Sequence, residues 1–210
     1  MIERDNPFEP VFFSTVLRGP RLVLIPYSEE RDFDHIASLY SNPIVSAAIG
    51  IPHPAPYVEG LRQAKRDRME RSDVGDWTAL VGTETAGNST EEAEVFAGEV
   101  GIGQCEFRTL VMEVFIAIDP VHAGKGFGRE AASLLIEHIF SHVPLATVRM
   151  HTLASNRKLL ALGMSLGFRE TGERWVEADP ARGFAGSFAA ILDCRIHEFR
   201  KYTRNEEPMP

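Results

Sequence analysis

A short glycine-rich segment carries the residue types with the clearest chemical use in this chain. Gly124, Gly126 and Gly128 alternate with Lys125 and Phe127, between an apolar, β-branched run and a run with helical spacing. The first N–H groups of a helix have no partner inside the helix, and they carry partial positive charge. Glycine lets a phosphate approach that backbone without a Cβ in the way, and Lys125 adds a cation. The segment therefore predicts a site for pyrophosphate.

Two common pyrophosphate loops do not fit this spacing. A nucleotide P-loop needs Ser or Thr directly after its Gly-Lys pair, whereas Gly126 follows Lys125 here. A dinucleotide fingerprint needs an acid about twenty residues further on to bind the ribose. No Asp or Glu lies between Glu137 and Glu170. The spacing therefore disfavours both interpretations.

The segment AGKGFGREA instead resembles the acyl-CoA pyrophosphate loop of the GNAT superfamily of N-acetyltransferases. Gly126 and Gly128 match the two small positions of that loop, whereas Ala123 stands where the family has Gln or Arg. The longer run EVFIAIDPVHAGKGFGREA is similar to the branch that acetylates the N-termini of ribosomal proteins, with Glu130 and Ala131 matching. This resemblance implies that the bound pyrophosphate belongs to coenzyme A.

Two further segments carry the same resemblance. Residues 98–101 read GEVG, which is similar to the Gly-x-Ile-Gly of the family. Residues 154–172 read ASNRKLLALGMSLGFRETG, and they match the family pattern at Asn156, Gly167, Phe168 and Gly172. Leu159 replaces a small or hydroxyl residue, and Gly163 stands where many members carry a tyrosine thought to act as general acid. The resemblance covers residues 21–175.

Hydrophobic patterning predicts the elements that position the loop. Residues 111–118 read as a strand that ends at Asp119-Pro120, and a helix follows the loop up to residue 140. Residues 147–153 read as the next strand, so the three elements make a right-handed parallel crossover. The resemblance implies an α+β GNAT fold with a splayed parallel strand pair. Its central sheet is mixed and mostly antiparallel, with about six to seven strands and helices on both faces.

The other elements follow from the same patterning and from capping residues. Further strands are predicted at residues 11–13, 21–27, 77–82, 95–105, 173–177 and 189–202. Further helices are predicted at residues 29–41, 58–71 and 156–166. Ser28 and Ser155 are the expected N-caps, and Asn42-Pro43 is expected to stop the first of these helices. The charged helix at 58–71 has a solvated face or, with the proline-rich link at 51–57, lines the acceptor cleft.

The resemblance implies that acetyl-CoA binds as co-substrate where the two parallel strands splay apart. The pantetheine arm is expected to pair with free backbone groups of residues 115–118, one of which can serve as an oxyanion donor. Asn156 is expected to reach the arm from the following helix. The expected cofactor-binding residues are Phe115, Ile116, Ala117, Ile118, Ala123, Gly124, Lys125, Gly126, Phe127, Gly128, Arg129 and Asn156. No metal site is predicted.

Two side chains are candidates for the base that accepts the proton of the amine. We adopt Glu113, which lies on the same strand face as Phe115 and Ala117 because strand side chains alternate. His151 is the rival, since an imidazole titrates near neutrality. With glycine at position 163, no side chain is assigned as the acid, and water or the incoming ammonium is expected to supply that proton.

Composition bounds the class of protein. The chain has 210 residues, of which 44% are hydrophobic and 25% are charged, and its net charge is −8. An acidic chain disfavours nucleic-acid binding, and the absence of a long apolar segment or signal peptide predicts a cytoplasmic protein without membrane contact. Cys105 and Cys194 lie far apart, which predicts buried free thiols. The expected organisation is an arm at 1–20, one acetyltransferase domain at 21–203 and a polar tail at 204–210.

These observations predict an acetyl-CoA-dependent N-acetyltransferase in which a primary amine attacks the thioester directly. The acceptor is a protein N-terminus, as in the branch that the chain resembles, or a small amine. The pattern is compatible with a homodimer. The altered residues Ala123, Leu159 and Gly163 leave open a non-catalytic acyl-CoA-binding sensor or interaction module. A nucleotide-binding regulator is a third alternative, which the loop spacing disfavours.

Overall fold

The computed structural model of the chain describes residues 11–49, 58–71, 74–83, 93–106, 108–143, 146–176 and 187–203. Its strands are β1 (Leu17–Arg18), β2 (Leu22–Pro26), β3 (Gly75–Thr83), β4 (Ala93–Glu106), β5 (Val111–Ile118), β6 (Thr147–Leu153), β7 (Arg169–Val176) and β8 (Ser187–Arg195). Its α-helices are α1 (Val11–Ser14), α2 (Glu29–Ser41), α3 (Pro43–Ile49), α4 (Val58–Met69), α5 (Phe127–His142), α6 (Arg157–Ser165) and α7 (Ile196–Thr203). A 3₁₀ turn, η1 (Pro120–His122), precedes α5.

The strands of the described residues form one eight-stranded sheet in the order β1-β2-β3-β4-β5-β6-β8-β7. Strands β5 and β6 are parallel, and all other neighbours are antiparallel. The predicted α+β fold with a mixed, mostly antiparallel sheet is therefore confirmed, with one strand more than the upper expectation. The additional short strand is β1, which pairs with β2 at the edge of the sheet.

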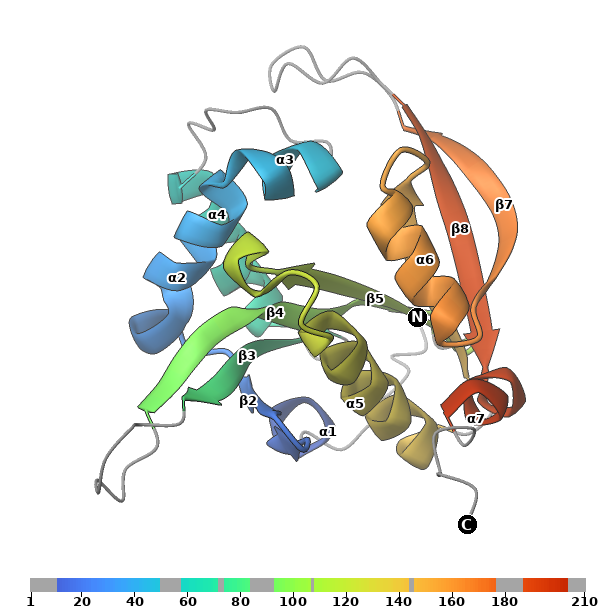
Figure 1. The fold of residues 1–210 in the computed structure, drawn as a ribbon, viewed down its shortest axis with the longest axis horizontal. Coiled ribbons are helices and arrows are strands. Elements are labelled where there is room, and N and C mark those ends of the chain that lie inside the picture. Colours follow the sequence, from blue (N-terminus) through green and yellow to red (C-terminus); the bar gives the residue numbers. More distant parts are fainter. Residues whose placement is uncertain are drawn as a thin grey trace, which may run out of the picture.

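Helices cover both faces of the sheet (Figure 1). Leu135, Ile136 and Ile139 of α5 pack in the main core, together with the β5 side chains Met112 and Val114. Smaller clusters on the other face join the strands to helices α2, α3 and α4. Because β5 residues alternate between these two cores, the strand is covered on both sides.

Two predicted strand segments are wrong. Residues 11–14 form helix α1 rather than a strand. Strand β8 ends at Arg195, and residues predicted to continue it form α7 instead. Glu198 accepts a hydrogen bond from the Arg195 N–H at 3.0 Å, and Phe199 packs against Phe140 of α5. The carboxylate thus caps the start of α7, and the core contact favours the helix.

Helix α3 was not predicted. Asn42 ends α2 as expected, but Pro43 then begins a second helix. The Asn42 side chain accepts a hydrogen bond from the Ile44 N–H at 2.9 Å. Asparagine before the helix and proline at its first position are both favourable at a helix start. The signal interpreted as a stop is therefore also a start.

Other expectations have mixed outcomes. Cys105 and Cys194 are free and buried, as predicted, and burial raises the pKa of Cys194 to about 12. None of the described helices has the length and apolar character needed to cross a lipid bilayer. The proline-rich link at 51–57, the first part of the arm at 1–10 and the tail at 204–210 lie outside the described residues.

Candidate active site

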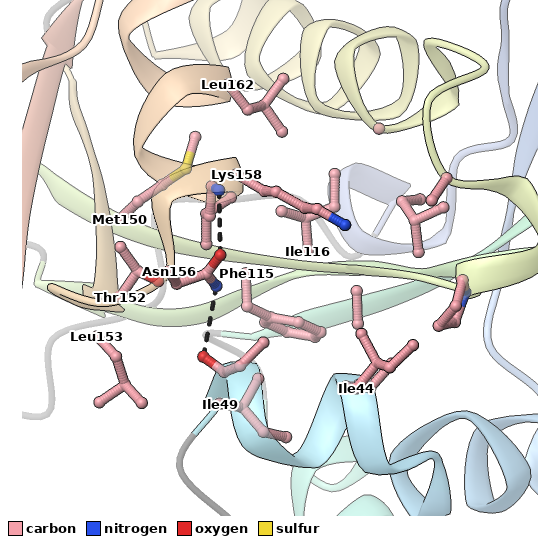
Figure 2. A pocket seen from close by; sticks show the side chains of 18 of the residues that line it. Ile44, Ile49, Phe115, Ile116, Met150, Thr152, Leu153, Asn156, Lys158 and Leu162 are labelled. Atoms are coloured by element: carbon pink, nitrogen blue, oxygen red, sulfur yellow. Dashed lines mark hydrogen bonds between the residues drawn. The ribbon is translucent and has the colours of Figure 1, made fainter.

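The site is built where β5 and β6 separate. These parallel strands pair at only three positions, the last of which joins Glu113 to Arg149. Beyond this point both strands line a cavity of about 930 Å³. Ile44 and Ile49 line the cavity from α3 on one side, and Leu162 lines it from α6 on the other (Figure 2). The predicted splayed strand pair is thus present, and a large part of its opening is apolar.

The glycine-rich loop forms one end of the cavity. Gly124 and Gly126 have φ values of 77° and 84°, a left-handed conformation that glycine adopts without strain. Gly126 is the N-cap of α5, so the first N–H groups of α5 lack intrahelical partners. In the part of the chain that the structure describes, no hydrogen bond uses the N–H groups of Gly124, Gly126, Phe127 or Gly128. These four donors are available to an anion.

Two other amides of the loop are used within the turn itself. The Ala123 N–H donates to the Pro120 carbonyl at 3.1 Å, and the Lys125 N–H donates to the His122 carbonyl at 3.4 Å. The predicted cofactor-binding residues that line the cavity are Phe115, Ile116, Ala117, Ile118, Ala123, Gly124, Gly126, Phe127, Gly128, Arg129 and Asn156. Lys125 does not line the cavity, and neither does Glu113.

Two ring nitrogens in the cavity wall lack hydrogen bonds. The Nδ1 atoms of His122 and His151 are buried and make no hydrogen bond among the described residues, although that of His151 lies 3.2 Å from Glu113 Oε2. Buried polar atoms are almost always hydrogen-bonded, so each such atom calls for an explanation. Glu113 accounts for the position of the His151 nitrogen, and a polar ligand in the cavity would account for that of His122. The cavity size, the available amides and the His122 nitrogen together fit an extended ligand that carries phosphate at one end.

Arg21, the residue before β2, stabilises the shape of the glycine-rich loop. Its side chain donates to the Lys125 carbonyl at 2.8 Å and to the Glu130 carboxylate at 2.8 Å. Its guanidinium also lies over the Phe127 ring, 5.0 Å from the ring centre. A Cβ added at Gly126 would lie 3.1 Å from Arg21 Nη2. The loop is thus held in shape by contacts outside the cavity, which no motif in the sequence indicates.

Asn156 joins two helices rather than pointing freely into the cavity (Figure 2). Its Oδ1 accepts from the Leu159 N–H at 3.2 Å, so Asn156 is the N-cap of α6 in place of the predicted Ser155. Its Nδ2 donates to the Ala48 carbonyl at 3.3 Å, at the end of α3. The side chain lines the cavity while both of its polar atoms are engaged. Its predicted contact with the cofactor remains a prediction.

The two candidate bases lie side by side where β5 and β6 part. Glu113 Oε2 is 3.2 Å from His151 Nδ1, without hydrogen-bond geometry between the two atoms. His151 lines the cavity, whereas Glu113 sits behind it. The two candidates that the sequence analysis set against each other are therefore a contact pair.

Position 163 cannot supply an acid in this structure. Gly163 is buried in α6, and a Cβ added there would lie 3.1 Å from the Leu192 side chain. The position therefore faces β8 rather than the cavity.

A layer of buried charge lies beneath Phe115. Lys65 of α4 is only 4% exposed and contacts Asp76 and Glu99, so the expected solvated face is wrong for this residue. Burial lowers the pKa of Lys65, an effect that Asp76 opposes. Burial would raise the pKa of Asp76, but bonds from Arg68 and the charge of Lys65 hold it below its usual range.

This layer stiffens the wall of the cavity. Tyr40 donates to Glu99 at 2.8 Å, and the cations of Lys65 and Arg68 lie 5.6 and 5.2 Å from the centre of the Phe115 ring. Helix α4 is therefore connected to the cavity through its contacts with the Phe115 ring. Its described residues do not line the cavity directly.

Residues 21–169 match a family model described as an acetyltransferase (GNAT) domain. No curated protein sequence matches the chain. A putative acetyltransferase from T. thermophilus is similar in structure, with a TM-score of 0.72 and 18% identity over 92% of this chain and 95% of that one.

Two structures from Vibrio cholerae are also similar. A spermidine N-acetyltransferase in complex with CoA and spermine has a TM-score of 0.69 and 18% identity over 86% of this chain and 99% of that one. A putative ribosomal-protein-serine acetyltransferase has a TM-score of 0.67 and 13% identity over 87% and 98% of the two chains. At such identities the likeness concerns the fold. Because the family model spans most of the sequence and the fold agrees with it, the chain belongs to the GNAT family of acetyltransferases.

Proposed function

We propose that this protein is an acetyl-CoA-dependent N-acetyltransferase that acts on a primary amine. The observation that carries the proposal is the position of the loop's unused amides at one end of a cavity between splayed strands. Those amides and the N-terminus of α5 would bind the pyrophosphate. Arg129 and Lys158 also line the cavity and add positive charge. The backbone of residues 114–118, which is not paired with β6, would bind the pantetheine arm as an added strand does.

The contact between Glu113 and His151 supports a base made of two residues. His151 faces the cavity and would take the amine proton, while Glu113 orients the ring and stabilises its charged form. A backbone N–H of β5 would donate to the thioester oxygen as charge develops there. With Gly163 facing β8, the proton for the departing thiolate comes from water or from the acceptor ammonium.

The acceptor is a protein N-terminus or a small amine. The loop resembles that of the branch that modifies ribosomal proteins, and a putative ribosomal-protein-serine acetyltransferase is among the similar structures. The spermidine N-acetyltransferase shows that a similar fold also serves small amines. Both are primary amines, so the same base and the same cofactor cleft would serve either.

A thiol-release assay with acetyl-CoA and a panel of amines tests the proposal. We expect CoA to raise the melting temperature and at least one amine to release thiol. If CoA stabilises the protein but no amine releases thiol, the protein is the non-catalytic acyl-CoA-binding module. If ATP or NAD stabilises it and CoA does not, the loop assignment is wrong.

A further inference from the structure

The cavity has a wall on the sheet face opposite α5 and α6, where an acceptor would approach His151. Strand register places Leu153, Ala189 and Arg174 in one row across β6, β8 and β7, so their side chains share this face. All three residues line the cavity, and Ala48 and Ile49 of α3 line it as well. Apolar side chains therefore lie between His151 and the guanidinium of Arg174, which is at the end of the row.

Arg174 has no counter-charge among the residues that the structure describes. Its side chain is exposed, and among the described residues it makes no hydrogen bond or ion pair. None of the described residues that line the cavity is Asp or Glu. Lys158, the other cavity cation without a described partner, comes from α6 on the face that carries the phosphate loop, and Figure 2 shows it extending across the cavity. Arg174 is thus the guanidinium on the acceptor side.

Four carboxylates on the strands around the cavity are already engaged. Asp193 forms a two-pronged ion pair with Arg149, with N–O distances of 2.7 and 2.8 Å. Asp76 and Glu99 are buried with Lys65. Glu113 lies against His151 and does not line the cavity. A second ammonium on the same acceptor would find no free carboxylate on the described wall, so the wall disfavours a polyamine.

The distances suit an acceptor that carries opposite charges at its two ends. His151 lies opposite Ile191, two residues along from the row that holds Arg174. Strand spacing puts the Cα atoms of His151 and Arg174 roughly 12 Å apart, a distance that the long, flexible Arg174 side chain is able to shorten. An amine at His151 and a carboxylate at Arg174 would then be a few bonds apart, with an apolar group against Leu153 and Ile49.

Given the proposed transferase function, we infer that the acceptor is a primary amine with an apolar body and a carboxylate, as in apolar amino acids and short peptides. Arg174 is the specificity-determining residue, because its guanidinium binds that carboxylate. The inference names the substrate class of the proposed reaction and rests on that function.

The test compares kcat/KM for leucine, leucinamide, leucyl-leucine, its carboxamide and spermidine, in a thiol-release assay. In the wild-type protein we expect a carboxylate to be preferred over the matching carboxamide, and spermidine to be the poorest acceptor. In Arg174→Gln the ratio of carboxylate to carboxamide should fall about ten-fold, the loss expected for one charge-assisted pair. Comparing ratios between variants cancels the different basicities of the free amines.

Arg157→Gln is the matched control. Arg157 is an exposed residue of α6 that does not line the cavity, so this variant has the same change in net charge and should keep the wild-type ratio. Arg174→Lys should keep part of the preference. Preference for spermidine, or a ratio that is the same in wild type and Arg174→Gln, overturns the inference and leaves the transferase function standing. Stabilisation by CoA without thiol release for any amine overturns the transferase function and the inference with it.

Discussion

Gly126 combines two roles that a larger residue could not fill. Its φ of 84° favours glycine, and its missing side chain leaves room beside Arg21 and for an anion. We expect Gly126→Asp to abolish CoA binding, because the carboxylate would crowd and repel the phosphates. Calorimetry measures the affinity. Gly60→Asp is the control, since nothing lies within 4 Å of a Cβ at that position in α4. Unchanged affinity in Gly126→Asp would contradict the loop assignment.

The pairing of Glu113 with His151 makes a prediction about pH. If the two residues act together, Glu113→Gln should lower turnover and move the pH dependence of kcat, whereas His151→Gln should remove that dependence. The KM for acetyl-CoA should change little in either variant, because neither residue belongs to the phosphate loop. The measurement is a pH–rate profile at saturating acetyl-CoA. A profile in Glu113→Gln that matches the wild type would exclude Glu113 from the mechanism.

The sequence predicted the loop glycines but not this contact. The glycines lie within a few residues of one another, so their geometry depends on local backbone only. Glu113 and His151 come from different strands, and their contact depends on the register of β5 against β6. Register is a property of the folded sheet, which explains why two partners were treated as rivals.

Among the elements, β2 is linked to the phosphate loop by Arg21, the residue before it. Arg21→Met would release the Lys125 carbonyl and leave Glu130 without its cation. We expect the KM for acetyl-CoA to rise about ten-fold while kcat changes little, because the loop loses shape but the base is untouched. Arg18→Met, an exposed position on β1, is the control and should match wild type. An unchanged KM would show that the loop keeps its shape without the hydrogen bonds of the Arg21 side chain.

Asn156 couples α3 to α6. Asn156→Ala removes an N-cap and the bond to Ala48, and should lower the free energy of unfolding by about 1 to 2 kcal/mol. Ser155→Ala should have almost no effect, because Asn156 is the N-cap. Urea denaturation of both variants measures the difference. Equal destabilisation by the two substitutions would argue against the assigned cap.

Helices α3 and α7 mark the limit of pattern-based prediction at this scale. The sequence around Asn42 and Pro43 ends one helix and begins another, and only the second outcome supplies Ile44, Ala48 and Ile49 to the cavity. The start of α7 depends on Glu198 and on packing against Phe140. The latter contact joins residues far apart in sequence, which local patterning does not capture.

At the scale of the molecule, charge pairs between helices predict acid lability. Glu29 of α2 bonds Arg66 and Arg62 of α4, and these bonds lower its pKa from 4.5 to about 2. A lowered carboxyl pKa contributes stability that is present above about 4.5 and is lost as pH falls towards 2. We therefore expect Glu29→Gln to destabilise the protein at neutral pH and much less at the acid end.

Urea denaturation at several pH values, at low and high salt, measures this difference. Salt should reduce the effect because the pair is exposed to solvent. Glu30→Gln, at an exposed neighbouring position, is the control. If the difference in the free energy of unfolding between wild type and Glu29→Gln does not change with pH, the lowered pKa of Glu29 is refuted.

The overall architecture was predicted more completely than the site. The order from β5 through the loop and α5 to β6 is encoded in contiguous residues, and the structure confirms it. The buried layer of Lys65, Asp76 and Glu99 was missed, because a charged helix usually faces solvent and its sequence does not indicate which charges meet buried partners.

The short ladder between β5 and β6 also affects how easily the two parts of the sheet move relative to each other. Three paired positions form the only ladder between the half-sheet of β1 to β5 and the half-sheet of β6, β8 and β7 in the described residues. A ligand in the cavity borders both half-sheets and would hold them together where β5 and β6 separate. Substitutions at Val111 or Thr147, far from the phosphate loop, should therefore alter ligand affinity by changing how easily the halves part.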